Sequence, residues 1–276
     1  MKLKQIPESL IKAYRLNKLA HDELHGAGPT PLPIIISFTS IPSRFHIVHT
    51  AIRSMLHQTQ PAEKVILWLH ESHHGKLPKK VMDLIGPRFD IMFVPLDCPH
   101  IKLIYALNAY PEKTIITCDD DLLYHTEFIS RLYQSHQSFP NDIIANQCRR
   151  ITYTNTGEIS PYLTWPNVES IGYSSQDLLP LGYAGILYPP KCLHTDVTNE
   201  ALFTLLTPKA DDLWFKCMAT INNTQTRRSC NPSPNPRPII GSQKISLKSE
   251  NVHQDRNRLQ WQKLTLHYNL DTTAFK

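Results

Sequence analysis

Residues 114–121 read Thr-Ile-Ile-Thr-Cys-Asp-Asp-Asp, an apolar, β-branched run that ends abruptly in three carboxylates. A continuous run of this kind is typical of a strand buried on both faces of a parallel sheet. Three adjacent ionised acids cannot lie inside such a sheet without partners, because a buried charge is costly. We therefore expect them at the carboxyl end of the strand, where open α/β sheets bind their ligands. Oxygen ligands there suit Mg²⁺ or Mn²⁺, ions that usually accompany phosphates, whereas a solvated acidic turn is the alternative.

The sequence before this run alternates between strand and helix patterns. The resulting prediction is a mostly parallel central sheet flanked by helices, an α/β fold. Buried strands are predicted at 31–38, 65–69, 91–94 and 115–117, and helices at 46–58, at 101–107 and after Thr126, which is expected to cap its helix.

From residue 141 onward the pattern becomes irregular. Helices are predicted at 201–206 and 213–218, separated around Pro208, and residues 222–238 form a polar, Pro-rich stretch that predicts a loop. We predict one domain over 31–276, with a nucleotide-sized α/β half at 31–140 and, at 141–276, a more irregular half with a C-terminal tail that could shape a second substrate pocket.

Composition limits the class of protein. The chain has 276 residues, 41% hydrophobic and 19% charged, and a net charge of +5, which favours anionic ligands without demanding nucleic acid. It has no membrane-spanning run, no apolar core of a secretory signal, and six scattered cysteines without a C-x-x-C pair. These features predict a cytoplasmic protein. The basic N-terminal segment 1–30 predicts a helix packed on the domain, or alternatively a helix on the inner face of the membrane.

A second acidic pair, Asp211 and Asp212, directly precedes the helix predicted at 213–218. Aspartate is a good helix starter, because the helix dipole favours carboxylates at this end. Taken together with residues 119–121, however, the pair suggests a transferase. One acid cluster would hold a metal on a leaving diphosphate, and the other would offer a general base for an incoming hydroxyl.

An ordered set of motifs resembles a bacterial group of family-2-like glycosyltransferases. The opening motif Ile36-Ser-Phe-Thr-Ser-Ile-Pro-Ser-Arg44 is similar to the S-[LF]-T-S-x-P-x-R start of that group. Further matches, in the order that the group shows, are 65–69, 102–107, 115–121, Pro161-Tyr162 with Trp165, 185–190 and 210–214, with a weak likeness at 251–260. The resemblance implies a GT-A fold that uses a nucleotide-diphosphate sugar, a divalent metal and a glycan or lipid-linked acceptor.

The resemblance also implies roles for single residues. Asp119 and Asp121 match the metal-binding ends of the family's D-x-D motif, and Asp119 and Asp120 match positions that reach the nucleotide sugar. Thr39, Arg44 and Lys102 match further nucleotide or diphosphate contacts. Asp212, with Asp211, matches the catalytic pair, and Trp165 and Gly185 fall on the acceptor side. Two departures are the run Gln147-Cys-Arg-Arg150, where a His-containing run is expected, and the long Pro-rich stretch at 222–250.

Other readings of the sequence remain open. A hydrolase of a sugar phosphate or glycoside would use the same acids with water as acceptor, and a catalytically inactive member would only bind sugar. His70-Glu-Ser-His-His74 fits the H-E-x-x-H zinc signature, but it follows a strand-like run, so we expect a loop rather than a zinc site. Arg227, Arg228 and Arg237, with Lys244 and Lys248, lack the interleaved aromatic residues of RNA readers and predict a solvated loop or phosphate gate.

Overall fold

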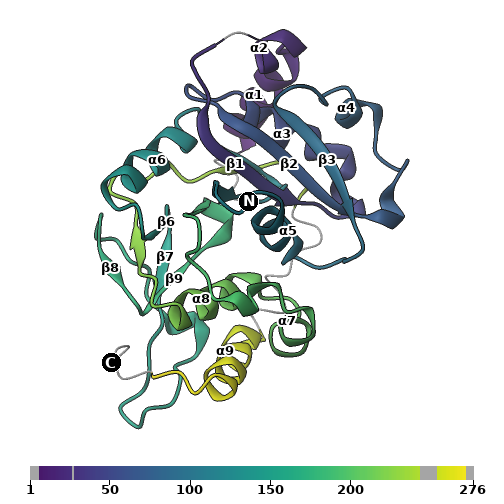
Figure 1. The fold of residues 1–276 in the computed structure, drawn as a ribbon. Coiled ribbons are helices and arrows are strands. Elements are labelled where there is room, and N and C mark those ends of the chain that lie inside the picture. Colours follow the sequence, from purple (N-terminus) through teal and green to yellow (C-terminus); the bar gives the residue numbers. More distant parts are fainter. Residues whose placement is uncertain (1–5, 27, 243–253, 272–276) are drawn as a thin grey trace.

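The protein is organised around a single sheet with helices on both faces (Figure 1). The structure, a computed structural model, describes residues 6–26, 28–242 and 254–271. Lys244, Lys248 and residues 251–253 of the weak C-terminal likeness lie outside these ranges. The helices are α1 (Ile6–Lys18), α2 (His21–His25), α3 (Phe45–Leu56), α4 (Lys79–Met82), α5 (Ile101–Ala109), α6 (Phe128–Ser138), α7 (Glu200–Leu206), α8 (Asp211–Ile221) and α9 (Arg256–His267).

Among the described residues, the main sheet has eight strands in the order β3-β2-β1-β4-β10-β6-β11-β8. They are β1 (Leu32–Thr39), β2 (Ala62–His70), β3 (Phe89–Val94), β4 (Thr114–Thr117), β6 (Ile143–Ala145), β8 (Ser174–Ser175), β10 (Ile186–Tyr188) and β11 (Thr226–Arg228). Strands β1 to β4 are mutually parallel, and β6 and β11 share their direction; only β10 and β8 run the other way. The predicted mostly parallel α/β sheet is confirmed.

Two short pairings lie outside the main sheet. Strand β7 (Cys148–Arg150) pairs with β9 (Leu178–Pro180), and β5 (Leu122–Leu123) pairs with β12 (Arg237–Pro238), both antiparallel.

The β-branched runs are buried on both faces of the sheet. On β1, Ile35 packs into one core, and Ile34 and Ile36 pack into the other. The core on the Ile34 side is covered by α1, α2, α3, α4 and α6, and the core on the Ile35 side by α5, α7, α8 and α9. Alternate side chains of a strand point to opposite faces, so a continuous apolar run is the pattern that a doubly covered strand requires.

Two sequence predictions about local structure are wrong. Thr126 does not cap the helix that follows it: α6 begins at Phe128 after Glu127, and the Thr126 carbonyl accepts a hydrogen bond from the Thr59 amide. The stretch 222–238 is not only loop, because β11 pairs with both β6 and β8 inside the sheet. Its polar composition hides this strand, since Arg227 and Arg228 use their side chains for internal contacts described below.

α1 packs on the domain, as one of the two alternatives predicted. The Ser9 hydroxyl donates to the Pro238 carbonyl at 2.7 Å, and the Lys12 amino group donates to the Tyr124 carbonyl at 2.7 Å. The outward face of the helix leaves Leu10, Ile11 and Tyr14 exposed. No helix within the described ranges is long and apolar enough to cross a membrane.

Gly185 provides a test of the packing between the sheet and α6. Its φ of +91° is unfavourable for other residues, and a Cβ there would run into the Phe128 ring. We expect Gly185→Ala to lower the free energy of unfolding by about 2–5 kcal/mol, from backbone strain plus overpacking. Gly75→Ala is the matched control, because its φ is +73° but nothing lies within 4 Å of the added methyl. Urea unfolding should show a clearly larger loss for Gly185→Ala; equal losses would contradict the packing account.

Candidate functional site

The first acidic cluster lies where the sequence predicted it, at the carboxyl end of β4. Because β1 runs parallel to β4 as its neighbour, the carboxyl end of β1 lies beside the cluster. The Ser40 hydroxyl donates to one Asp120 oxygen, and the Arg44 guanidinium donates to the other at 2.6 Å. A second guanidinium nitrogen of Arg44 lies 3.0 Å from an Asp121 oxygen. Arg44 is thus held by two of the three acids, and this fork geometry suits planar carboxylates.

Lys102 joins the two acidic clusters. Its amino group lies 2.8 Å from an Asp211 carboxylate oxygen and 3.4 Å from an Asp119 oxygen, and its side chain is 9% exposed. Burial alone would lower the pKa of Lys102, but Asp211, Asp119 and Asp212 outweigh it and hold that pKa well above its ordinary value. The lysine is therefore a permanent cation between β4 and α8.

The position of Lys102 is fixed from the sheet side. The Ser37 hydroxyl, in the middle of β1, donates to the Lys102 backbone carbonyl, and the Trp68 indole N–H donates to the Ser37 oxygen at 2.8 Å. This relay ties the first turn of α5 to β1 and β2. The lysine side chain consequently starts from a fixed point beside the carboxyl edge of the sheet.

Asp212 lies in the first turn of α8, beside Asp211. One of its oxygens accepts a hydrogen bond from the Gly182 amide at 2.9 Å, and the other is buried and has no hydrogen-bond partner among the described residues. Burial, and then the charge of Asp211, raise the pKa of Asp212 to about 7, against the opposing effect of Lys102. A carboxyl group with this pKa can accept a proton near neutral pH.

Gly182 is a site residue that sequence reasoning missed. A Cβ at this position would lie 2.7 Å from an Asp212 oxygen, so only glycine allows the backbone to approach the carboxylate this closely. Tyr124 was also missed. Its buried hydroxyl accepts from the Asp119 amide at 2.8 Å and donates to the Tyr183 carbonyl at 3.1 Å, which links the two sides of the site. The Gly-Tyr-Ala-Gly run at 182–185 was the available sequence signal for the glycine.

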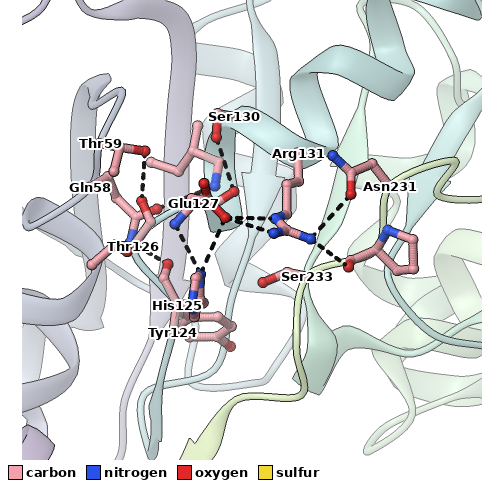
Figure 2. Close-up of polar contacts among 12 residues, drawn as sticks. Gln58, Thr59, Tyr124, His125, Thr126, Glu127, Ser130, Arg131, Asn231 and Ser233 are labelled. Carbon is pink, nitrogen blue, oxygen red and sulfur yellow. Dashed lines mark hydrogen bonds and ion pairs between the residues drawn. The ribbon is translucent and has the colours of Figure 1, made fainter.

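The segment that follows the acidic cluster is braced against α3 (Figure 2). The Gln58 amide donates to the His125 carbonyl at 2.9 Å, and Thr59 binds the Thr126 carbonyl through its amide and its hydroxyl. On the next turn, Arg131 pairs with Glu127 at 2.7 Å and reaches Asn231 at 3.1 Å. The bracing begins at the last acid, because the Asp121 carbonyl accepts from the Ile239 amide at 2.8 Å.

The remaining predicted site residues fall into two groups. Thr39 ends β1 as expected, with its hydroxyl bonded to the Trp68 carbonyl at 2.8 Å. Trp165 is buried in the core, 2% exposed, with its indole N–H bonded to the Ser160 carbonyl, so it offers no face on which a sugar can stack. Gly185 is explained by its packing against Phe128. Their acceptor roles remain predictions that the geometry does not support.

The acids of the predicted metal site do not form a preformed metal cage among the described residues. Within residues 6–26, 28–242 and 254–271, no group of three or more His, Cys, Asp and Glu side chains could hold a metal ion. Asp119 is the most accessible of the three acids, with a side chain 33% exposed, whereas Asp121 is paired with Arg44. Mg²⁺ in phosphate sites is often held by one or two carboxylates plus the phosphates themselves. The residues therefore fit an ion that arrives with a diphosphate, not a preformed cage.

The two other sequence motifs have structural explanations. His70 to His74 runs from the end of β2 into a 3-10 turn, as expected, so the two histidines are not one helical turn apart. Arg227 pairs with Asp142 at 2.7 Å and covers the Phe139 ring at 3.6 Å, and Arg228 is buried. The solvated loop predicted for these arginines is wrong, because both belong to strand β11.

Comparisons with known proteins give a distant likeness only. No protein-family model matches the sequence, and no curated protein is significantly similar to it. The inositol-1-phosphate CTP transferase of T. maritima is similar in structure, with a TM-score of 0.44 and 9% identity over 84% of this chain and 95% of its own. The 4-diphosphocytidyl-2C-methyl-D-erythritol synthase of Anaerococcus prevotii DSM 20548 gives 0.46 and 9% over 82% and 95%. Likenesses this distant say nothing of the reaction.

Asp212 gives a prediction that does not depend on function. Its ordinary pKa is 3.8 and its folded pKa is about 7, so the folded protein binds more protons than the unfolded chain between these values. The contribution of Asp212 to stability is therefore lost as the pH rises toward 7. Asp212→Asn keeps the hydrogen-bond acceptor for Gly182 and removes this loss.

We expect Asp212→Asn to gain stability relative to the wild type as the pH is raised from about 5 to about 8. Urea unfolding of both proteins at both pH values measures this change as a difference of differences, which cancels the titration of other groups. A wild-type-to-mutant difference that does not vary with pH would show that the carboxyl group is ionised throughout.

Proposed function

We propose that this protein is a glycosyltransferase of the GT-A type, moving a sugar from a nucleotide-diphosphate donor to a hydroxyl group of a glycan or lipid-linked acceptor. The observation that carries the proposal is the bridge from Asp119 through Lys102 to Asp211, with Asp212 beside it. It places a fixed cation and a carboxyl group of near-neutral pKa together at the carboxyl edge of the sheet. Sugar transfer with inversion uses both: the cation stabilises the leaving diphosphate, and the carboxylate accepts the proton of the acceptor hydroxyl.

The donor half of the site would use the two cations. A leaving diphosphate develops negative charge, which preorganised positive groups stabilise without reorganising at the moment of reaction. Lys102 and Arg44 are already held at the strand ends by carboxylates, so both are oriented before any ligand arrives. We assign the ribose and nucleotide contacts to Thr39, Asp119 and Asp120, at the same edge.

A divalent ion, Mg²⁺ or Mn²⁺, belongs to the proposal as a group bound together with the donor. When bound, it would neutralise charge on the diphosphate. Asp119 would hold it through its accessible carboxylate, and Asp121 would join when Arg44 exchanges its contact for a phosphate oxygen.

The acceptor half would use Asp212 as the general base. The carboxyl group would receive the proton of an acceptor hydroxyl while the Gly182 amide holds one of its oxygens in place. Asp211 is paired with Lys102, so its role is to orient the lysine and to raise the pKa of its neighbour Asp212. A single base of this kind implies that the configuration at the sugar carbon is inverted.

Donor binding tests the first half of the proposal. We expect UDP or GDP to bind more tightly with Mn²⁺ than with EDTA, and Asp119→Ala to weaken the Mn²⁺-dependent binding by about tenfold to hundredfold, the loss expected for a charge-assisted contact. Asp83→Ala, an exposed acid remote from the site, is the matched control for the change in charge. Calorimetry measures nucleotide binding by the wild type with Mn²⁺ and with EDTA, and by Asp119→Ala and Asp83→Ala with Mn²⁺. Binding that ignores both Mn²⁺ and the Asp119 substitution would remove the metal from the proposal.

Turnover tests the second half. We expect Asp212→Asn to reduce turnover by about 10²–10⁴-fold, the range typical of a lost general base, while donor affinity changes little. Activity of the wild type should fall as the pH drops below about 7, because the carboxyl group then carries a proton. NMR of the product determines whether the sugar configuration is inverted. A retained configuration, or near-normal turnover of Asp212→Asn, would exclude the base role and leave the fold assignment untouched.

The same assays separate the rival functions. A hydrolase would release free sugar at the same rate with and without an acceptor, and an inactive sugar-binding member would bind the donor without turnover. Contact with a membrane surface through the exposed residues Leu10, Ile11 and Tyr14 of α1 stays a separate prediction. Co-sedimentation with anionic vesicles tests it.

A further inference from the structure

The strand pair β7–β9 carries Arg149, a cation to which the proposed function assigns no role. Strand β7 pairs with β9 so that Arg149 lies opposite Leu179, and beyond the pair the Leu181 amide donates to the Gln147 carbonyl at 3.0 Å. The next residue is Gly182, whose amide holds the Asp212 carboxylate. The backbone hydrogen bond at Leu181 and the one at Gly182 thus connect β7 with Asp212, the proposed base.

The two arginines of β7 differ in their partners. Alternation along a strand places Gln147 and Arg149 on one face and Cys148 and Arg150 on the other. Arg150 forms an ion pair with the buried Asp177. Arg149 has no carboxylate partner in the part of the chain that the structure describes. It donates to the Tyr162 carbonyl at 3.1 Å, and its guanidinium lies 4.9 Å from the centre of the Tyr162 ring.

A second arginine, Arg228, contacts the side chain of Gln147, which lies on the same strand face as Arg149. Arg228 is 5% exposed, and among the described residues it also has no carboxylate partner; its Nε is buried without a hydrogen bond. Its one hydrogen bond to a side chain goes to the Gln147 carbonyl oxygen at 2.9 Å. The Gln147 amide group is thereby turned outward, where it donates to Asn235 at 3.0 Å. A buried charge with only neutral partners is costly and is relieved by an anion.

Two tyrosines connect these arginines with Asp212. Burial raises the pKa of the Tyr183 hydroxyl, and both Arg149 and Arg228 oppose the rise. Burial likewise raises the pKa of Tyr162, where Arg149 opposes the rise and Asp212 adds to it. Arg149 is therefore near both phenol groups, and it shares the Tyr162 hydroxyl with Asp212 and the Tyr183 hydroxyl with Arg228. Tyr183 is 41% exposed, so this surface is open to a ligand.

We propose that Arg149, supported by Arg228 and Gln147, binds an anionic group, a carboxylate or a phosphate, on the acceptor whose hydroxyl faces Asp212. The proposal rests on the proposed transferase function and names the class of its acceptor: an acidic sugar or a phosphate-bearing glycan. The donor diphosphate is assigned to Lys102 and Arg44, so the Arg149 cation is left for the second substrate. A guanidinium group can bind either anion through two parallel hydrogen bonds.

A matched pair of small probes tests the charge requirement. Methyl glucuronide and methyl glucoside differ only at C6, where the first has a carboxylate and the second a hydroxymethyl group, and glucose 6-phosphate supplies the phosphate arm. We expect ligand-observed NMR to show at least one charged sugar binding about tenfold or more tightly than the glucoside, with an affinity that falls as salt is added. The arm that binds identifies the anion. Equal binding of all three sugars overturns the proposal.

Substitutions locate the site. Arg149→Gln should bring the charged sugars to the level of the glucoside, and Arg149→Lys should recover part of the difference. Lys113→Gln, a surface lysine paired with Glu63, is the control for net charge and should change nothing. Unchanged binding by Arg149→Gln refutes the assignment. Calorimetry of the wild type with UDP or GDP keeps the two proposals apart. A wild type that binds nucleotide normally but shows no preference for the charged sugars refutes the acceptor subsite alone, whereas absent nucleotide binding refutes the transferase.

Discussion

The whole site depends on one buried cation. Lys102 has lost most of its water, a change that disfavours a charged amino group unless carboxylates replace the solvent. It finds Asp119 at the end of a strand in the first half of the chain and Asp211 at the start of a helix in the second half. One ammonium group is thus paired with a carboxylate from each half, so the electrostatics that stabilise this contact also fix the relative position of the two halves.

This arrangement explains why the site is both rigid and ready to exchange partners. Each cation is held by carboxylates that a phosphate can replace or supplement, as with Arg44 on Asp120 and Asp121. A ligand diphosphate would therefore meet groups already oriented and would spend little binding energy on ordering them. Burial, and then the charge of the neighbouring Asp211, raise the pKa of Asp212 and turn an ordinary carboxyl group into a candidate base.

The site also requires that the backbone approach neighbouring side chains closely. The Gly182 amide can reach the Asp212 carboxylate only because no side chain intervenes, and Gly185 takes a positive φ against the Phe128 ring. The Tyr124 hydroxyl then ties the Asp119 amide to the Tyr183 carbonyl across the gap between the acidic clusters. The surface that joins the base to Arg149 is built on this same short run of chain, so the proposed donor and acceptor regions share their supports.

The sequence by itself determined the first half of the fold and the types of residue in the site. Long β-branched runs such as Ile34 to Phe38 are buried on both faces, and an acid triplet at the end of such a run has only the strand's edge to occupy. The sequence did not show that 226–228 is a strand, because its arginines contact Asp142, Phe139 and Gln147, all distant in the chain.

Only the tertiary structure decided which charges meet. Lys102 and Asp211 are more than a hundred residues apart in the sequence, and no local pattern records their pairing. The burial of Trp165 and the absence of a carboxylate beside Arg149 among the described residues were equally invisible. A charged residue carries the same letter whether it is paired, solvated or waiting for a ligand, and its neighbours in space set its pKa and its function.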